Sequence, residues 1–278
     1  MTETGTDIQT ILISGTPALA VDEAGAGPLL VFMHGIGGNR TNWTDQILHF
    51  ANEGFRAVAW DARGYGDSDD YDGPLDFSDF ARDLNRLLDH YGVTKAHLCG
   101  LSMGGRIAQD FHALFADRVA TLSLVATHAG FGNFTPEEQE KFVTLRLKPL
   151  AEEDKEPKDI APVVAASLRG PDATDEQYLR LVASMEMLHK ESYMKTVRAT
   201  AMFDRTADLD SIAVPTLLIY GESDPLTGPE IGQTMHERIA HSEMVVIPRA
   251  GHLINLEKPA EFEAALRPFL AKHRDLAY

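Results

Sequence analysis

Short runs of apolar residues constrain the fold of this chain more than any other feature of its sequence. They cover residues 29–33, 57–60, 96–99, 122–126, 216–220 and 243–247. Most of them are followed directly by a glycine, a proline or a polar residue. Runs this short, without polar alternation, are typical of strands that are buried on both faces of a parallel sheet.

Stretches with helical spacing separate these runs. Residues 77–91 carry apolar side chains at Phe77, Phe80, Leu84, Leu87 and Leu88, close to the 3.6-residue period of a helix. Residues 104–115 and 259–273 have the same character. The alternation of strands and helices predicts an α/β fold with a mostly parallel, twisted sheet flanked by helices.

The alternation stops after about Gly130 and resumes at Val214. Between these points we find charged helical stretches at 136–147, 174–188 and 191–203, and a charged segment at 152–159 that predicts a solvated loop. We therefore expect a helical cap inserted into the core. The expected division is core at 1–131, cap at 132–207, and core again at 208–278.

Composition limits the partners that the chain can have. Its 278 residues are 44% hydrophobic and carry a formal net charge of −17, which repels nucleic acids and anionic membrane surfaces. The one cysteine, Cys99, excludes an internal disulfide and fits a reducing compartment. We see neither a signal peptide nor an apolar run of the ~18–20 residues that cross a bilayer, so we expect a cytoplasmic protein.

The motif Gly100-x-Ser102-x-Gly104 lies directly between the run at 96–99 and a helical stretch. A serine in this strand-turn-helix context projects its hydroxyl out of the backbone. The following helix places positive dipole density beside a developing oxyanion. The motif predicts that Ser102 is the nucleophile of a serine hydrolase. The alternative is a glycine-rich turn in which the serine only caps the helix.

A serine nucleophile needs a base, and this kind of motif is followed in the chain first by an acid and then by a histidine. His252 lies in a loop just after the run at 243–247. Asp224 follows the run at 216–220, with Glu222 as a nearby competitor. We predict His252 as the base and Asp224 as the acid that orients it.

Two backbone N–H groups are needed to hold an oxyanion. One is expected from Met103, the residue after the serine, and the other from Ile36 in the loop His34-Gly35-Ile36-Gly37-Gly38. A phosphate-binding turn is the alternative for this loop. Its spacing is not Gly-x-Gly-x-x-Gly, and no Gly-Lys-Ser/Thr follows.

In order along the chain, these motifs resemble those of α/β-hydrolase-fold serine hydrolases. The matching segments are 34–38, 61–68 (Asp-Ala-Arg-Gly-Tyr-Gly-Asp-Ser), 100–105, 221–224 and 251–259. Stretches 87–93, 99–109, 212–216 and 251–257 are most similar to the group of 3-oxoadipate enol-lactonases and carboxylesterases. The resemblance implies a Ser-His-Asp triad, an ester or lactone substrate and no cofactor.

Other activities known for this fold differ in how well they fit the residues of this chain. Haloalkane dehalogenases and epoxide hydrolases carry aspartate where this chain has Ser102. Hydrolases that cleave C–C bonds of ring-fission products usually have tryptophan soon after the histidine, whereas Leu253-Ile254-Asn255 follows here. A cofactor-free perhydrolase or haloperoxidase and a ligand-binding receptor of the same fold remain alternatives.

The cap is expected to select the substrate. We predict a pocket lined by Gly35, His128, Met185, Met202, Leu226 and Leu253. A substrate carboxylate would most simply be held by an arginine. Candidates are Arg106, Arg146, Arg169, Arg180, Arg198 and Arg205, which the sequence does not rank. Histidine spacing predicts no metal site. The expected partner is a small molecule, and a homodimer is a further expectation.

Overall fold

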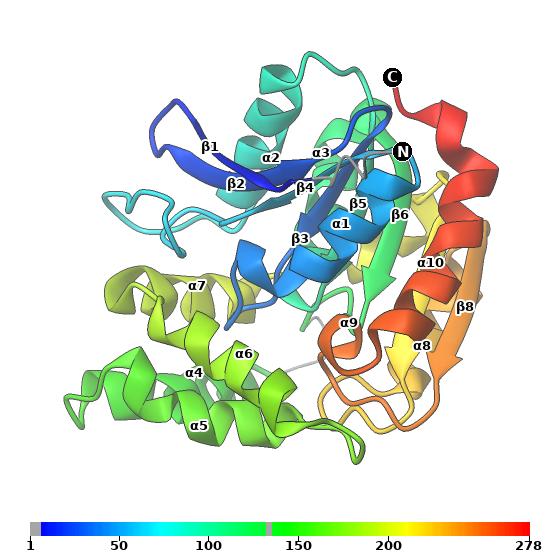
Figure 1. The fold of residues 1–278 in the computed structure, drawn as a ribbon. Helices are drawn as coiled ribbons and strands as arrows, with labels where there is room; N and C mark the ends of the chain where they lie inside the picture. The colour runs from blue at the N-terminus through cyan, green and yellow to red at the C-terminus, as the bar shows by residue number, and fades with distance from the viewer. Residues whose placement is uncertain (1–6, 132–134) are drawn as a thin grey trace.

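The computed structural model describes residues 7–131 and 135–278. Its centre is an eight-stranded sheet in the order β1-β2-β4-β3-β5-β6-β7-β8 (Figure 1). β1 and β2 pair antiparallel with each other, β2 pairs antiparallel with β4, and the remaining pairs are parallel. The strands are β1 (Gln9–Ile13), β2 (Leu19–Ala24), β3 (Leu29–Met33), β4 (Arg56–Trp60), β5 (Ala96–Leu101), β6 (Val119–Val125), β7 (Thr216–Gly221) and β8 (Ser242–Ile247).

The six strands predicted from apolar runs are confirmed as β3 to β8. β1 and β2 were not predicted, and their composition explains why. β1 is an edge strand with mostly exposed residues, so it carries no continuous apolar signal. β2 is buried but contains Asp22, whose carboxylate accepts hydrogen bonds from Thr10 and Arg40. A charged side chain interrupts the apolar run of a buried strand, so a search for apolar runs misses that strand.

Helices cover both faces of the sheet (Figure 1). α1 (Thr44–Asn52) and α10 (Pro259–His273) pack together on one face. α2 (Ser78–His90) and α3 (Met103–Phe115) pack together on the other face, where α8 (Pro229–Arg238) covers β7 and β8. The buried apolar side chains accordingly form two clusters, one on each side of the sheet.

Four helices between β6 and β7 lie beyond the carboxyl ends of the parallel strands (Figure 1). They are α4 (Pro136–Ala151), α5 (Pro157–Leu168), α6 (Asp175–Glu186) and α7 (Lys190–Met202), and we call them the cap. The described part of this segment contains no strand. The limits 132 and 207 stay a prediction, and residues 132–134 lie outside the described residues.

The solvated loop predicted at 152–159 is wrong at its end, because α5 begins at Pro157. Glu156 forms a capping box with Asp159, and Pro157 occupies the first helical position, where its missing N–H is not needed. Glu156, Lys158 and Asp159 therefore belong to a helix start rather than to a loop.

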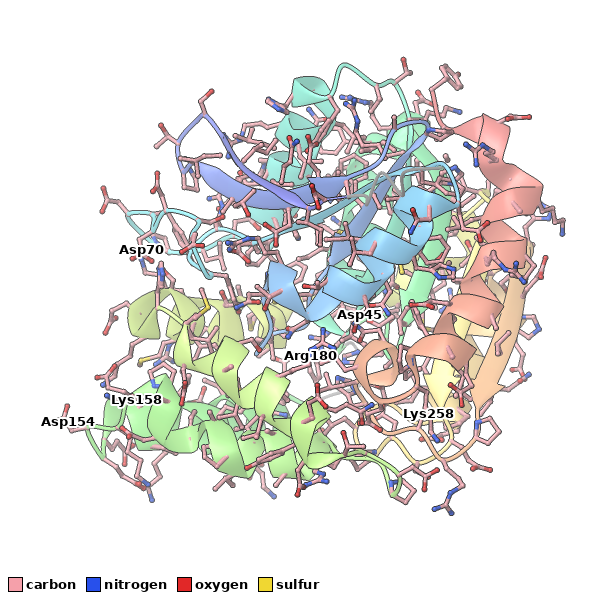
Figure 2. All side chains as sticks on the ribbon, viewed as in Figure 1. Asp45, Asp70, Asp154, Lys158, Arg180 and Lys258 are labelled. Carbon is pink, nitrogen blue, oxygen red and sulfur yellow. The ribbon has the colours of Figure 1, made fainter. Side chains whose placement is uncertain are left out.

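The cap touches the core through polar contacts at its α6 side. Arg180 of α6 forms an ion pair of 2.6 Å with Asp45 of α1, and the two lie together in Figure 2. Asp154 and Lys158 lie at the far end of the cap in the same view. Within the described ranges, the protein has no helix that is long and apolar enough to cross a membrane.

Candidate active site

Ser102, Asp224 and His252 come from three different loops at one edge of the sheet. Ser102 follows β5, Asp224 follows β7, and His252 lies in the loop after β8. These strands are parallel, so their carboxyl ends lie at the same edge. That edge is where open α/β sheets bind their ligands, and it is the edge that faces the cap.

Ser102 occupies a strained turn. Its φ of 53° and ψ of −110° place a non-glycine residue at positive φ, immediately before the first residue of α3. Such backbone conformations persist only where the surrounding structure enforces them. Ser102 N donates to Val125 O at 2.8 Å, and Thr127 Oγ1 donates to Ser102 O at 2.7 Å. The turn is therefore fixed from the neighbouring strand β6.

The glycines around Ser102 are required by close backbone approach. A Cβ on Gly100 would lie 2.2 Å from the Gly104 carbonyl, and a Cβ on Gly104 would lie 2.2 Å from Met33 O. A Cβ on Gly105 would lie 2.6 Å from Thr127 Cγ2. Helix α3 can start this close to β3, β5 and β6 only because these positions have no side chain.

His252 contacts Asp224, as the order of the motifs predicted. His252 Nδ1 lies 2.8 Å from Asp224 Oδ2, and both side chains are buried. The carboxylate can only accept, so Nδ1 is the donor of this hydrogen bond. Glu222, the competitor, instead accepts a hydrogen bond from Arg249 N at 2.9 Å.

Hydrogen bonds keep Asp224 ionised. Leu226 N and Thr227 N donate to its Oδ1 at 2.8 and 3.1 Å, and Thr227 Oγ1 donates to its Oδ2 at 2.7 Å. Burial by itself would raise the pKa of Asp224. The hydrogen bond and charge of His252, together with these donors, outweigh burial, so the pKa lies below the ordinary range.

The glycine-rich loop after β3 lies against Ser102. A Cβ on Gly35 would lie 3.5 Å from Ser102 Cβ. His34 fixes the loop, since its Nδ1 donates to Gly35 O at 2.8 Å and its Nε2 accepts from Ala62 N at 3.1 Å. The pKa of His34 is lowered chiefly by burial, so its ring is neutral.

The two predicted oxyanion donors are available. In the described parts of the chain, neither Ile36 N nor Met103 N donates a hydrogen bond. Tyr65 is fully buried and links the two positions. Its hydroxyl donates to Ile36 O at 3.1 Å and lies 4.0 Å from Met103 Sδ.

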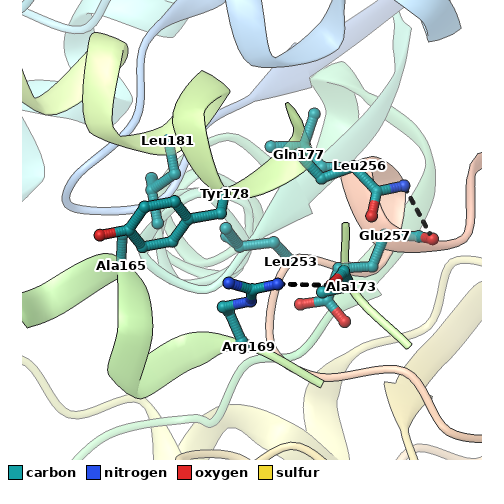
Figure 3. A pocket seen from close by; sticks show the side chains of 9 residues that line it. All are labelled: Ala165, Arg169, Ala173, Gln177, Tyr178, Leu181, Leu253, Leu256 and Glu257. Carbon is teal, nitrogen blue, oxygen red and sulfur yellow. Dashed lines mark hydrogen bonds between the residues drawn. The ribbon is translucent and has the colours of Figure 1, made fainter. Parts of the chain in front are cut away.

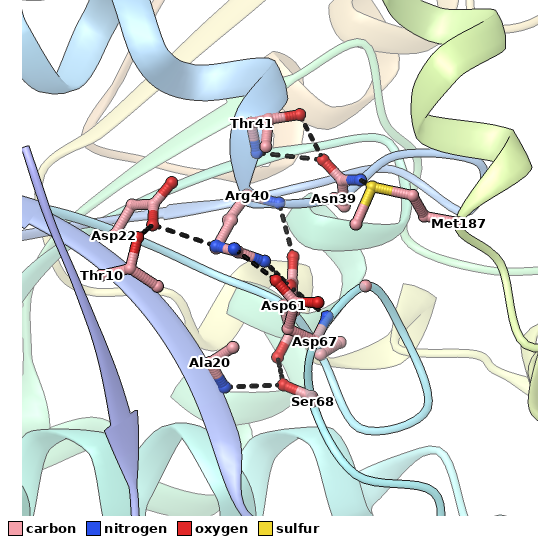
Figure 4. Close-up of polar contacts among 12 residues, drawn as sticks. Thr10, Ala20, Asp22, Asn39, Arg40, Thr41, Asp61, Asp67, Ser68 and Met187 are labelled. Carbon is pink, nitrogen blue, oxygen red and sulfur yellow. Dashed lines mark hydrogen bonds and ion pairs between the residues drawn. The ribbon is translucent and has the colours of Figure 1, made fainter.

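A buried ion network holds the glycine-rich loop to the loop after β4 (Figure 4). Arg40 pairs with Asp22 at 3.0 Å, with Asp67 at 2.6 Å and with Asp61 through a further short contact. Arg40 N also donates to Asp61 Oδ1 at 2.7 Å. The sequence showed this Asp61 segment only as a family motif, whereas the structure shows which loop it holds.

Glu257 is a second residue whose function the sequence did not reveal. Its buried carboxylate accepts from Gly251 N at 2.7 Å and from Gly170 N at 3.2 Å. His252 N donates to Leu168 O at 3.1 Å, so the histidine loop is also bonded directly to the end of α5. The cap and the histidine loop therefore share one buried carboxylate.

The predicted pocket residues fall into different places. Met185 is fully buried and packs on the glycine-rich loop, with Cγ 3.3 Å from where a Gly37 Cβ would lie. Leu253 lines a small cavity between the cap and the loop after β8 (Figure 3). Leu226 is 48% exposed. Met202, the last residue of α7, is 74% exposed, and its place in the pocket stays a prediction.

His128 lies in the loop after β6, near the same edge of the sheet. Its Nδ1 is hydrogen-bonded to the backbone of Gly130, and its ring packs edge-on against Phe131 at 4.8 Å between centroids. Burial, and then the charge of Arg106, lower its pKa to about 3, with His252 as a smaller cause. No cluster of metal-ligating side chains occurs within residues 7–131 and 135–278.

The model of the alpha/beta hydrolase fold family matches residues 28–259 of the chain. The chain belongs to this family. The match runs from β3 through the loop after β8, so it includes Ser102, Asp224, His252 and the glycine-rich loop. Together with the relatives described next, it makes the protein a hydrolase.

Curated relatives span several hydrolase activities. A 3-oxoadipate enol-lactonase of Acinetobacter baylyi is 29% identical over 88% of this chain and 89% of its own. A 2-hydroxy-6-oxononadienedioate/2-hydroxy-6-oxononatrienedioate hydrolase of Paraburkholderia phymatum is 29% identical over 98% of both chains. Identity at this level does not separate the two activities.

Among solved structures, a thermophilic esterase from Thermogutta terrifontis with malate bound has a TM-score of 0.85 and 30% identity. It covers 95% of this chain and 99% of its own. A hydrolase from Pseudomonas aeruginosa has a TM-score of 0.83 and 28% identity, covering 95% of this chain and 98% of its own. The resemblance to this fold and to the group of enol-lactonases and esterases is thus confirmed.

Proposed function

We propose that the protein hydrolyses a carboxylic ester or lactone through an acyl-enzyme, with Ser102, His252 and Asp224 as its triad. The observation that carries the proposal is the 2.8 Å contact of His252 Nδ1 with Asp224 Oδ2 at the sheet edge that also bears the strained Ser102. The esterase and enol-lactonase relatives support the choice of bond.

In the first half-reaction, Ser102 Oγ attacks the carbonyl carbon while its proton passes to His252 Nε2. The resulting oxyanion accepts hydrogen bonds from Ile36 N and Met103 N. The intermediate then collapses: the C–O bond to the leaving group breaks, and the leaving oxygen takes the proton from His252. Asp224 stabilises the imidazolium that forms between these steps without taking a proton itself.

In the second half-reaction, His252 Nε2 removes a proton from water, which attacks the acyl carbon. The same two N–H groups hold the second oxyanion. Collapse breaks the bond to Ser102 Oγ, which recovers its proton from His252, and the carboxylic acid product leaves. Besides the substrate and water, these steps use only groups of the chain itself.

Hydrolysis of short 4-nitrophenyl esters tests this mechanism. We expect Ser102→Ala to lower kcat by about 10⁴-fold or more, while circular dichroism and thermal unfolding remain like those of the wild type. Asp224→Asn should lower kcat by about 10⁴-fold because it favours the wrong tautomer of His252. Turnover near the wild-type rate in folded Ser102→Ala would exclude the mechanism.

Cleavage of a C–C bond is a second candidate, favoured by the Paraburkholderia relative that spans 98% of both chains. Loss of the absorbance of a 2-hydroxy-6-oxo-dienoate on adding enzyme would detect it. Cleavage of such a dienoate with no activity on esters or lactones would replace the first candidate.

The location and assembly belong to the proposal as well. We infer that the protein acts on small molecules and that it is cytoplasmic. The buried free thiol of Cys99, whose pKa is raised by burial, supports the cytoplasmic location. Cell fractionation tests the location. A homodimer stays a prediction, which light scattering can check.

A further inference from the structure

The structure separates the arginines that the sequence left unranked. Arg169 pairs with Asp175 at 3.1 Å, Arg180 with Asp45 at 2.6 Å, and Arg205 with Asp110 at 2.7 Å. Arg198 is exposed on α7. The two that remain are Arg106 of α3 and Arg146 of α4, and neither has an ion-pair partner among the residues of the described ranges.

Arg106 is a buried cation whose Nε and Nη1 lack a hydrogen-bond acceptor among the described residues. The residue is 7% exposed, and its Nε and Nη1 have no partner in the part of the chain that the structure describes. Buried guanidinium N–H groups normally find carboxylates or carbonyls, because leaving a buried polar group unpaired is costly, and more so when it is charged. Among the residues that the structure describes, no carboxylate forms an ion pair with Arg106.

Arg146 approaches the same region from the cap. Its guanidinium lies over the Phe142 ring at 3.6 Å, and the Arg106 guanidinium lies over the Phe131 ring at 5.3 Å. Phe131 and Phe142 contact each other at 4.8 Å between centroids. Two cations are thus held on the two rings of one aromatic pair, one from the core and one from the cap.

The two arginines also affect each other. Burial, and then the charge of Arg146, lower the pKa of Arg106 to about 9. Burial also lowers the pKa of Arg146. A value of 9 still leaves Arg106 charged at neutral pH. An anion between or beside the two guanidinium groups would relieve both the repulsion and the missing hydrogen bonds.

Arg106 lies next to the proposed nucleophile along the chain. Arg106 is four residues after Ser102 on α3, and Arg106 N donates to Ser102 O at 3.2 Å. The charges of both Arg106 and His252 lower the pKa of His128, and the His128 ring packs against Phe131. The backbone of Arg106 is thus bonded to Ser102, while its guanidinium group contacts Phe131, which in turn packs on His128.

We propose that Arg106 and Arg146 bind a free carboxylate of the substrate, so the protein acts on esters or lactones that carry a second, anionic carboxyl group. This inference rests on the proposed function for the reaction, but the anion site can be tested without turnover. Arg106 supplies the buried, planar pair of donors, and Arg146 supplies the charge from the cap.

Binding of glutarate, measured by isothermal titration calorimetry in 0.15 M NaCl, tests the site alone. We expect Ser102→Ala to bind glutarate, and the double variant Ser102→Ala/Arg106→Met to bind it about 10- to 100-fold more weakly, the range expected for charge-assisted hydrogen bonds. Arg198→Met in the same background is the matched control and should bind like its parent. Equal binding by the Arg106 and Arg198 variants would overturn the proposal.

Matched esters test the site during turnover. Mono-4-nitrophenyl glutarate is compared with the 4-nitrophenyl ester of glutaramic acid, which replaces the free carboxylate with a neutral amide of similar shape. We expect kcat/KM of the wild type to favour the carboxylate ester by about 10- to 100-fold. The ratio should fall toward one in Arg106→Met and fall less in Arg106→Lys and Arg146→Met.

The outcomes distinguish the two proposals. If both esters are hydrolysed equally and glutarate binding does not depend on Arg106, the carboxylate site is wrong although the hydrolase mechanism stands. If glutarate binds through Arg106 but neither ester is cleaved, the site stands and the proposed reaction on esters fails. Thermal unfolding of each variant shows that a loss of binding does not reflect a loss of fold.

Discussion

Arg40 and Arg106 are two equally buried arginines in opposite surroundings. Each is 7% exposed, and each belongs to the segment that follows a strand bearing the candidate site. Arg40 contacts three carboxylates, and although burial opposes its charge, Asp61, Asp67 and Asp22 raise its pKa. Arg106 contacts no carboxylate of the described residues, and burial with the charge of Arg146 lowers its pKa.

The difference separates a structural charge from a charge held ready for a ligand. In the folded protein, three carboxylates compensate the positive charge of Arg40. The result is a fixed connection between the loops after β3 and β4 (Figure 4). Folding leaves Arg106 uncompensated, so the free energy of its desolvation can be recovered only when an anion enters. Stability should therefore depend on Arg40, and ligand selectivity on Arg106.

Arg40→Met should have the largest effect on stability, a loss of about 3–5 kcal/mol in the free energy of unfolding, because it leaves buried carboxylates unpaired. Urea denaturation measures this change. Arg82→Met, at an exposed arginine of α2, is the control and should stay within about 0.5 kcal/mol of the wild type. A loss below 1 kcal/mol for Arg40→Met would remove the contrast between the two sites.

Glu257 is a buried anion whose carboxylate accepts hydrogen bonds from two backbone N–H groups, and Glu257→Gln extends the comparison to it. The amide retains one oxygen for Gly251 N or Gly170 N, but it brings an NH₂ group against these two donors. We expect a loss of about 1–3 kcal/mol in stability and a lower kcat with a smaller change in KM, because the His252 loop shifts. Unchanged kcat in a destabilised variant would limit Glu257 to a structural function.

Arg106→Met should leave the free energy of unfolding unchanged or raise it by up to about 1 kcal/mol, because an apolar side chain of similar length replaces a buried, unpaired charge. The same urea titration as for Arg40→Met provides the direct comparison. A loss similar to that of Arg40→Met would mean that Arg106 has structural partners and is not reserved for a ligand.

His128 gives the smallest and most specific effect. Its pKa in the folded protein is about 3, below the ordinary 6.5. Between these values the unfolded chain binds a proton that the folded chain does not, so this histidine makes stability fall as the pH drops from about 6.5 toward 3. Thermal unfolding from pH 7 to 4 should show a shallower decline in His128→Gln. An equal slope would contradict the buried, neutral state.

The sequence predicted the α/β core well because its signals are local. Each buried strand is a short apolar run, and the turn at Ser102 is encoded by glycines that have no room for a side chain. The sequence also predicted that Asp224 precedes His252 on a neighbouring strand end, and the structure places the two side chains in contact. Their catalytic functions stay a prediction until the variants are measured.

The remaining features depend on tertiary contacts, which a single sequence does not display. α5 was missed because charged residues and Pro157 and Pro162 interrupt its apolar pattern. The place of Met202 in the pocket stays a prediction, because its spacing does not reveal the rotation of α7 against the core. Arg106 could not be distinguished from five other arginines, because what sets it apart is the absence of a carboxylate contributed by distant segments.

The bonds from Leu168 and Gly170 to the histidine loop have a consequence for protein engineering. His252 N and the Glu257 carboxylate both reach into the connection between α5 and α6, where a Cβ on Gly170 would lie 2.3 Å from Gly251 N. A chimera that exchanges caps between relatives must therefore transplant residues 168–172 together with a compatible loop at 249–258. Breakpoints placed between these two segments would produce hybrids that fold but turn over slowly.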